Sequence, residues 1–366
     1  MKTKSRFRKC MTTLAAGLLV LAAGAAGQES PVTSPPRIAA AQMETRAGAN
    51  LEREFRARVA AQTAPMWIGY AVPIVTGRYY SCCTSDTCCG GCGLESRSQI
   101  TYQSDEPRGV KLEGAKFLLA LFRVENRAVD RIRTFTEDCP LDAGGLPFLW
   151  FTGVNVADSV ALLASFADAA EKDTARDVRR LGSAAVGSIS MHAGDFADSA
   201  LERFAAANRN EWLRERAISG LGSRDARGYA VLQRIAREDA SDRIRQRAVQ
   251  ALARSDEPAA LETVIEAARS DKSPRVRSQA LQLLGRKAGA RAVGAITAAI
   301  DNDPEADVKR RAVQALSQLP RDEGVPLLIQ LARTNKDPQV RRQAMTYLGQ
   351  SRDPRALKFF EEVLKQ

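Results

Sequence analysis

The second half of the sequence repeats itself at a nearly constant interval, and this constrains the fold more than any other feature. The phrase "LRERAISGLG" begins at Leu213 and returns in similar form four times, at intervals of 31, 32, 32 and 32 residues. The later copies are "IRQRAVQALA", "VRSQALQLLG", "VKRRAVQALS" and "VRRQAMTYLG". A unit of this size cannot bury its apolar side chains alone, so successive units must stack around a continuous core. The repeats therefore predict an α-solenoid and argue against an ordinary helical bundle.

Each repeat contains two segments with a helical spacing of apolar residues, separated by sequences that break helices. The breakers "SDKSP", "TNKDP" and "QSRDP" place Ser or Asp before Pro, which favours the start of a helix. We predict about six helix pairs between residues 158 and 350, and a last helix at 354–365 that covers the end of the stack. A small residue at a fixed place in each second helix permits close packing: Ala217, Ala248, Ala280, Ala312 and Ala344. The predicted fold is mainly α, with the solenoid at residues 157–366.

The N-terminus has the layout of a secretory signal peptide. Five basic residues precede an apolar run from Leu14 to Ala23, and the small residues at 23–25 follow an A-x-A pattern that suits cleavage. The run is shorter than the roughly 20 residues that span a bilayer, and no later segment is long and apolar enough to do so. We therefore assign residues 1–25 to a signal peptide and predict a periplasmic or secreted protein with no membrane span after cleavage.

The charge balance limits the choice of partner. The chain carries 54 basic and 43 acidic residues, a net charge of +11, and loss of the signal peptide leaves +6. A nucleic-acid-binding protein usually concentrates its basic residues on one face, and an exported protein would rarely meet nucleic acid. We expect a protein or peptide partner, no nucleic acid and no cofactor.

The segment between the signal peptide and the solenoid has two parts. Residues 26–64 are predicted to be a linker followed by a helix with apolar residues at Leu51, Phe55 and Val59. Residues 65–156 contain short runs rich in β-branched and aromatic residues, separated by Gly, Pro and Asn, which indicates a small, mostly β module. Within it, "RVENRAVDRIRTF" predicts two strands joined by a tight turn at residues 125–127.

Most of the cysteines lie in one stretch of this module, "SCCTSDTCCGGC". Cleavage at residue 25 removes Cys10 and leaves six, an even number: Cys82, Cys83, Cys88, Cys89, Cys92 and Cys139. Because compartments outside the cytoplasm favour disulfides and a small sheet gains from them, we predict two or three structural disulfides. A metal site or a redox centre is the alternative, since Cys89 and Cys92 form a C-x-x-C. The sequence does not decide the connectivity.

A basic residue occupies one position in five successive second helices: Arg214, Arg245, Arg277, Lys309 and Arg341. Stacking would arrange these residues as a ladder with steps of about 10 Å, from the usual distance between packed helices. The first interpretation is structural, with each basic residue paired to an acid of the turn before it, because Asp239, Asp271 and Asp303 keep the same period. The second interpretation is a binding face for an acidic partner or an anionic polymer.

Catalysis has little support in the sequence. The only histidine, His192, lies in "SISMHAGD" near a predicted helix end, and we interpret it as a surface or capping residue. With one histidine, the chain offers neither a histidine metal cluster nor an obvious Ser–His pair. We therefore predict that the protein is not an enzyme.

The repeats resemble HEAT repeats, in particular the short bacterial form of the phycobilisome lyases. The resemblance lies in the pattern D-P-x-V-R-x-x-A-x-x-x-L-G and the D-P-R-A-L turn that follows, present here as "KDPQVRRQAMTYLGQSRDPRAL". It covers roughly residues 158–366 and implies a HEAT-type solenoid. The whole arrangement is also similar to a group of exported bacterial HEAT-repeat domain proteins, a resemblance that brings no function with it.

Two enzyme families with this repeat are not matched in their functional residues. Deoxyhypusine hydroxylases hold iron with repeated His-Glu pairs, whereas His192 stands alone and is followed by Ala193. Bilin lyases act on cytoplasmic proteins, which does not suit an exported chain. The sequence therefore favours an exported, non-enzymatic scaffold for protein–protein interaction. The alternatives are an envelope protein with a metal or redox cysteine loop, and a solenoid that binds an anionic polymer through its basic ladder.

Overall fold

A computed structural model of the chain describes residues 36–75, 92–95, 115–137, 139–173, 175–224, 226–287 and 289–365. The predicted signal peptide and four residues of the cysteine loop, Cys82, Cys83, Cys88 and Cys89, lie outside the described residues. In the part of the chain that is described, no helix is long and apolar enough to cross a bilayer.

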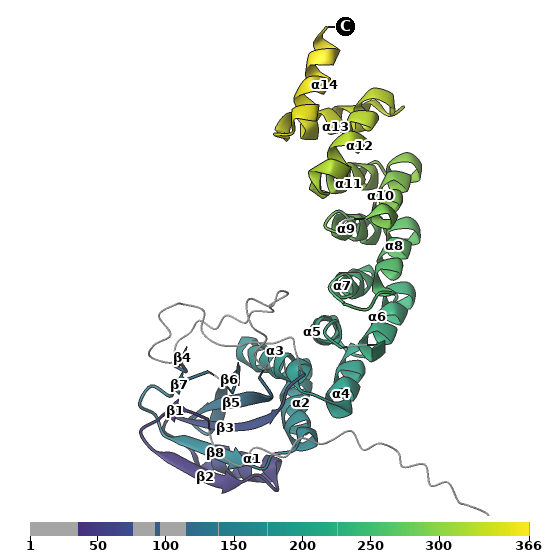
Figure 1. Cartoon of the computed structure of the whole chain (residues 1–366). Helices are drawn as coiled ribbons and strands as arrows, with labels where there is room; N and C mark the ends of the chain where they lie inside the picture. Colours follow the sequence, from purple (N-terminus) through teal and green to yellow (C-terminus); the bar gives the residue numbers. More distant parts are fainter. Residues whose placement is uncertain are drawn as a thin grey trace, which may run out of the picture. The chain divides into compact units, whose positions relative to one another are not determined.

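Two sheets form the centre of the predicted β module (Figure 1). The larger sheet has the strand order β2-β8-β3-β5-β6, with β2 at Met43–Ala47, β3 at Met66–Pro73, β5 at Phe117–Glu125, β6 at Ala128–Thr136 and β8 at Phe148–Thr152. β3, β5 and β6 are antiparallel neighbours, whereas β8 runs parallel to β2 and β3. The smaller sheet is parallel and has the order β1-β7-β4, with β1 at Ile38–Ala39, β7 at Leu141–Asp142 and β4 at Cys92–Gly93.

The predicted tight turn between β5 and β6 is confirmed. Asn126 and Arg127 have φ angles of 53° and 61°. Positive φ at both central residues matches the twist of a two-residue hairpin turn. The predicted helix before the module is also present, as α1 at Leu51–Ala61. The predicted linker, in contrast, contributes β1 and β2, whose partners β7 and β8 lie about a hundred residues later.

The two faces of the larger sheet are buried against different layers. Because side chains alternate along a strand, Ile68 and Tyr70 face one layer and Trp67 faces the other. The first layer consists of α1, α2 at Val156–Lys172 and α3 at Arg176–Met191. There, the rings of Phe55 and Phe122 lie 4.8 Å apart. The second layer contains the smaller sheet, which buries Trp67 and Trp150.

The later helices stack in pairs, as the repeats predict. Their bounds are α4 Asp195–Ala205, α5 Glu211–Leu221, α6 Ala226–Glu238, α7 Asp242–Leu252, α8 Ala260–Ser270, α9 Pro274–Leu284, α10 Ala290–Asn302, α11 Ala306–Gln318, α12 Arg321–Thr334, α13 Pro338–Gln350 and α14 Pro354–Leu364. Each second helix contacts the next second helix, from α3 through α5, α7, α9 and α11 to α13 (Figure 1). Six pairs, beginning with α2 and α3, are followed by α14, so the predicted fold class is confirmed.

Small residues set the spacing of the second helices. The five recurring alanines are fully buried, and Gly285 approaches the next second helix even more closely. A Cβ atom added to Gly285 would lie 2.6 Å from the carbonyl oxygen of Ala315. Helix starts follow the predicted chemistry, since the side chains of Ser241 and Asp337 accept backbone N–H groups at the starts of α7 and α13.

The first helix pair has a double role that the repeats alone do not reveal. α2 and α3 continue the stack of helices and also cover the larger sheet. At the end of α3, Val75 donates to the carbonyl of Met191 (3.0 Å) and Ala193 donates to the carbonyl of Pro73 (3.0 Å). One apolar core consequently runs from the sheet into the repeats, and residues 156–157 do not mark a break in packing.

Candidate functional site

The predicted basic ladder is a series of buried links between repeats in its first three steps. Arg245 on α7 is only 1% exposed. Its Nε and Nη2 donate to the two carboxylate oxygens of Asp271, at 2.8 and 2.9 Å, and its Nη1 donates to the carbonyl of Asp239 at 2.8 Å. These hydrogen bonds to Asp271 raise the pKa of Arg245, although burial acts against them. The guanidinium therefore stays charged and joins two turns.

The steps on either side repeat this arrangement. Arg277 donates to both carboxylate oxygens of Asp303, at 2.7 and 2.9 Å, and to the carbonyl of Asp271 at 2.8 Å. Arg214 pairs with Asp239 and donates to the carbonyl of Ala205 at 3.1 Å. The predicted pairing is corrected in one respect, because each carboxylate belongs to the following repeat, whereas the preceding turn supplies a carbonyl. Since all three arginines are buried, they are not available to a partner.

The last two members of the ladder differ from the first three. Lys309 replaces arginine and Asn335 stands where the earlier repeats have aspartate. Arg341 keeps the link to the preceding turn, since its Nη1 donates to the carbonyls of Asn335 (2.8 Å) and Lys336 (3.1 Å). Both Lys309 and Arg341 are half-buried. Towards the C-terminus, the ladder thus changes from buried ion pairs to partly exposed cations.

The described part of the cysteine loop begins at Cys92, which opens β4. β4 runs beside β7, and Cys92 is level with Leu141. Cys139 lies just before β7 and is 1% exposed, within the same apolar cluster as Leu94. The structure therefore brings Cys139 to the strand that begins with Cys92. No group of three or more His, Cys, Asp or Glu side chains suited to a metal occurs among the described residues.

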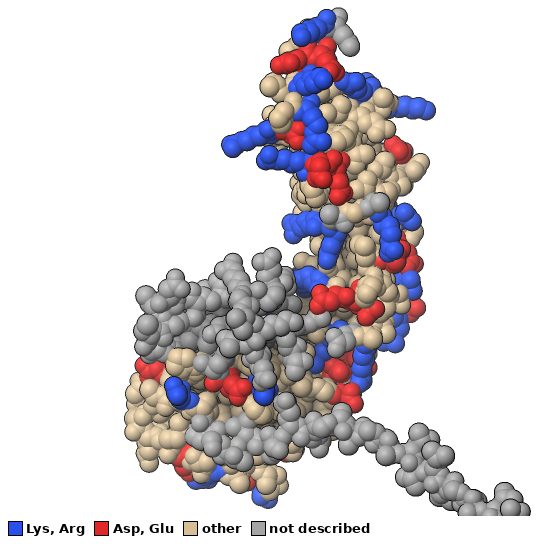
Figure 2. Space-filling view, viewed as in Figure 1, with Lys and Arg blue, Asp and Glu red and all other residues tan. Residues whose placement is uncertain are grey.

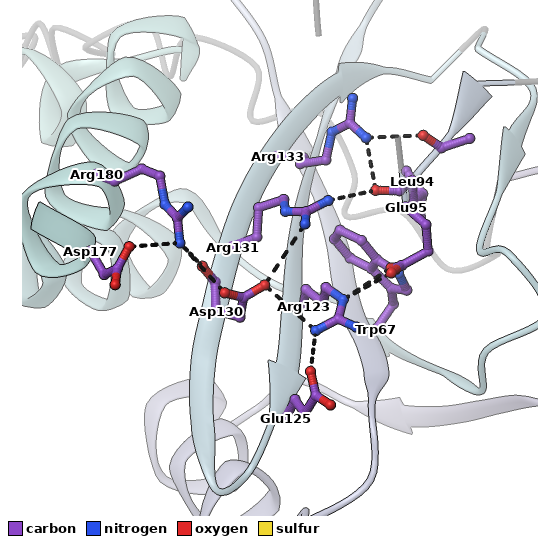
Figure 3. A network of polar contacts seen from close by, with 11 residues as sticks. Trp67, Leu94, Glu95, Arg123, Glu125, Asp130, Arg131, Arg133, Asp177 and Arg180 are labelled. Carbon is purple, nitrogen blue, oxygen red and sulfur yellow. Dashed lines mark hydrogen bonds and ion pairs between the residues drawn. The ribbon is translucent and has the colours of Figure 1, made fainter. Parts of the chain in front are cut away.

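Polar contacts hold residues 93–95 on the larger sheet (Figure 3). Arg133 donates to the carbonyls of Gly93 (3.0 Å) and Leu94 (2.8 Å). Glu95 accepts hydrogen bonds from Trp67 Nε1 (2.9 Å) and Arg123 Nε (3.1 Å). Burial lowers the pKa of Arg133 to about 10, and the nearby Arg131 acts in the same direction. No local pattern in the sequence marks these arginines, because they are spread over two strands and act on a distant segment.

Figure 3 also shows how this network reaches the helices. Arg123 forms a second ion pair with Glu125 (2.6 Å) and a longer one with Asp130 (3.5 Å). Asp130 in turn faces Arg180 of α3, at 3.4 Å. The network thus connects the end of the cysteine loop, the β5–β6 hairpin and the first helix pair.

His192 is buried, whereas the sequence suggested a surface or capping residue. It does occupy the C-cap of α3, but it is 0% exposed. Its Nδ1 lies 2.8 Å from the carbonyl of Ser188, and its Nε2 lies 2.7 Å from Ser159 Oγ, which in turn lies 3.0 Å from the hydroxyl of Tyr70. Since a carbonyl only accepts, Nδ1 carries the proton and Nε2 accepts from Ser159. Burial lowers the pKa of His192 to about 4.

The Tyr70–Ser159–His192 group joins β3, α2 and the end of α3. All three side chains are 0% exposed, so the group acts as a polar tie inside the apolar core. Burial also raises the pKa of Tyr70, which keeps the phenol neutral. No local pattern could have predicted this group, because Tyr70 and Ser159 are 89 residues apart.

A family model agrees with the fold of the repeats, and several solved structures are similar to part of the chain. A family model described as HEAT repeats matches residues 197–285, 229–317 and 293–366. The phycocyanin lyase complex of CpcE and CpcF from Nostoc is 24% identical, covers 42% of this chain and 98% of its own, and has a TM-score of 0.32. Human deoxyhypusine hydroxylase is 16% identical, covers 56% of this chain and 90% of its own, and has a TM-score of 0.24. Kap95p bound to RanGDP is 15% identical, covers 54% of this chain and 31% of its own, and has a TM-score of 0.36. No curated protein matches the chain.

Proposed function

Because this chain is a HEAT-repeat protein, we propose that it is an exported, non-enzymatic scaffold that holds a protein or peptide partner against its repeats. The buried ladder is the observation that carries the proposal. The Arg245–Asp271 and Arg277–Asp303 pairs join the α6–α7, α8–α9 and α10–α11 repeats. Side chains on the outer surface of the second helices are consequently held in a regular array, and such arrays are what solenoids offer to partners.

The distribution of reactive groups supports a role without catalysis. The only histidine of the chain is buried and hydrogen-bonded at both ring nitrogens. Burial also encloses Ser159 and Tyr70, the hydroxyl groups next to it. A general base must reach a substrate, and this histidine is enclosed by the core.

The predicted signal peptide at residues 1–25 supports export, and export supports disulfides in the cysteine loop. We propose that Cys139 and the loop cysteines are structural staples of the small β module. The burial of Cys139 beside the strand that begins with Cys92 supports this role. Thiol titration of the denatured mature protein tests it, with at most two free thiols expected. Six free thiols together with bound zinc would favour a metal site instead.

A site-specific cross-link tests the scaffold itself. A photoreactive amino acid replaces Thr346, which is exposed on the second helix α13, in the mature protein within its own cell envelope. The matched control replaces Arg234, which is exposed on the first helix α6. We expect a discrete protein adduct from position 346 and none from position 234. Co-purification of only a small molecule or a metal would contradict a scaffold.

A further inference from the structure

The first helices neutralise their own charges across neighbouring repeats. Arg227 of α6 pairs with Glu202 of α4 at 2.6 Å, and Arg237 of α6 pairs with Glu266 of α8 at 2.6 Å. The same kind of pair recurs further along the stack, between Arg291 and Glu262 and between Arg333 and Glu362. The outer surface of the first helices therefore offers little unbalanced charge to a partner.

The second helices from α9 to α13 carry a different surface, which we call the α9–α13 basic face. It consists of four exposed basic residues whose helical positions lie on one side: Arg275, Arg310, Arg311 and Arg342. Asp307 is the one acidic residue within these three helices, and it pairs with Arg310 at 2.7 Å. Figure 2 shows basic side chains projecting beside this part of the stack.

The other three basic residues of this face have no carboxylate within ion-pair distance among the described residues. The earlier second helices differ, because Arg243 and Arg247 of α7 both pair with Glu215 of α5. Between α5 and α13, exposed arginines without an ion pair among the described residues are therefore concentrated from α9 onward, with Arg216 of α5 as the earlier exception. Like charges on stacked helices repel one another, so an anionic partner would gain from every cation that it neutralises.

The spacing of the face favours an extended peptide. Packed helices lie about 8–10 Å apart, and three residues of a polyproline II chain span about 9 Å and bring every third side chain to the same side. Acidic residues at every third position of a peptide in this extended conformation would therefore meet α9, α11 and α13 in turn. Gln279 and Gln314 are half-buried beside the basic residues, and their amides can hydrogen-bond a peptide backbone.

We propose that the α9–α13 basic face binds an extended acidic segment of a partner protein. This inference rests on the proposed scaffold function and names the chemistry of its partner. It also moves the predicted basic contact away from the buried Arg214, Arg245 and Arg277. Arg275, Arg311 and Arg342 are its exposed members without an ion pair among the described residues, one on each helix.

A fluorescent 18-residue peptide with glutamate at every third position, and glycine or serine elsewhere, tests the proposal with the full mature protein. We expect fluorescence anisotropy to show binding at 50 mM salt that weakens steeply by 300 mM, because exposed charges are screened over about 8–10 Å at physiological salt. The triple variant R275E/R311E/R342E should bind at least tenfold more weakly. The matched control R234E/R269E/R321E makes the same charge change on first helices and should stay within twofold.

Equal losses in the two triple variants, or no loss in the first, would overturn the proposal. A single-stranded oligonucleotide of the same charge that binds more tightly, and is lost with the same variant, would assign the face to nucleic acid and overturn it as well. Circular dichroism melting checks the fold, and R275Q/R311Q/R342Q replaces the reversal if that variant unfolds. If a partner cross-links at position 346 as strongly in the triple variant as in the wild type, the scaffold function stands and this face is not its site.

Discussion

Arg245 and Asp271 form a two-pronged ion pair that joins consecutive repeats inside the stack. Nε lies 2.8 Å from Oδ2 and Nη2 lies 2.9 Å from Oδ1, and neither side chain is more than 5% exposed. The same pair recurs one repeat later between Arg277 and Asp303. Because the pairs are buried, they act on the coupling between repeats more than on the surface of the solenoid.

Loss of one partner of this pair should destabilise the protein strongly. Asp271→Asn keeps the shape of the side chain but leaves the Arg245 guanidinium buried without its counter-charge. Removing one member of a buried pair typically costs about 3–5 kcal/mol. Urea denaturation followed by circular dichroism should therefore show a clear fall in the midpoint.

An exposed pair provides the control for this variant. Glu262→Gln removes the partner of Arg291, and both side chains of that pair are more than half exposed. Exposed pairs contribute about 0–1 kcal/mol, so the midpoint should hardly move. Equal shifts in the two variants would mean that burial does not decide the strength of the ladder.

Gly285 should tolerate no side chain, because the backbone of the next second helix lies against it. In Gly285→Ala, the new Cβ would lie 2.6 Å from the Ala315 carbonyl oxygen. Such overpacking costs about 1–3 kcal/mol. Gly294→Ala is the matched control, since nothing lies within 4 Å of its added Cβ and the position is inside α10.

The control should stabilise the protein by up to about 1 kcal/mol, because alanine favours a helix over glycine. Thermal melting of both variants measures the difference. If Gly285→Ala melts at or above the wild-type temperature, the close contact between α9 and α11 is not a constraint on packing.

The buried His192 should make the folded protein less stable as the pH is lowered. Its pKa is about 4 in the folded protein and 6.5 ordinarily; burial is the main cause, and the charge of Arg224 adds to it. Between these two values the unfolded chain binds more protons than the folded one, so stability is lost as the pH falls through this window. The full effect is about 3 kcal/mol, from about 1.4 kcal/mol per unit.

His192→Gln separates this contribution from that of the carboxylates. The variant cannot titrate, so its urea midpoint should fall less than that of the wild type between pH 7 and pH 4.5. The quantity compared is the slope of the urea midpoint against pH in the variant and in the wild type. Parallel slopes would show that His192 does not control the acid sensitivity of the junction between β3, α2 and α3.

The arginine contacts to residues 93–95 should protect the end of the cysteine loop. Arg133→Met keeps the apolar stem of the side chain but removes the donors to the carbonyls of Gly93 and Leu94. We expect the backbone amide of Leu94, which donates to Asp142 at 2.7 Å, to exchange with solvent at least tenfold faster, because local opening then costs less. Arg46→Met removes an exposed arginine whose contact to Glu44 is local, and should leave this amide unchanged. Unchanged exchange in Arg133→Met would show that strand pairing alone holds the segment.

The repeat period by itself determined the solenoid, its six helix pairs and the last helix. That information is local, because each helix is encoded by apolar residues three and four positions apart and by Ser or Asp before Pro at its start. The ladder positions could also be located, since they recur with the same period. The hairpin turn was evident for the same reason, because it depends on adjacent residues.

Only the tertiary structure decided which groups meet across long distances in the chain. It placed β1 and β2 against strands a hundred residues later, enclosed His192 with Ser159 and Tyr70, and aimed Arg133 at the end of the cysteine loop. It also buried Arg245 and Arg277 and left Arg275, Arg311 and Arg342 exposed. Arginines that look alike in the sequence differ in this way because stacking, which no single repeat specifies, determines the side of each helix that the next repeat covers.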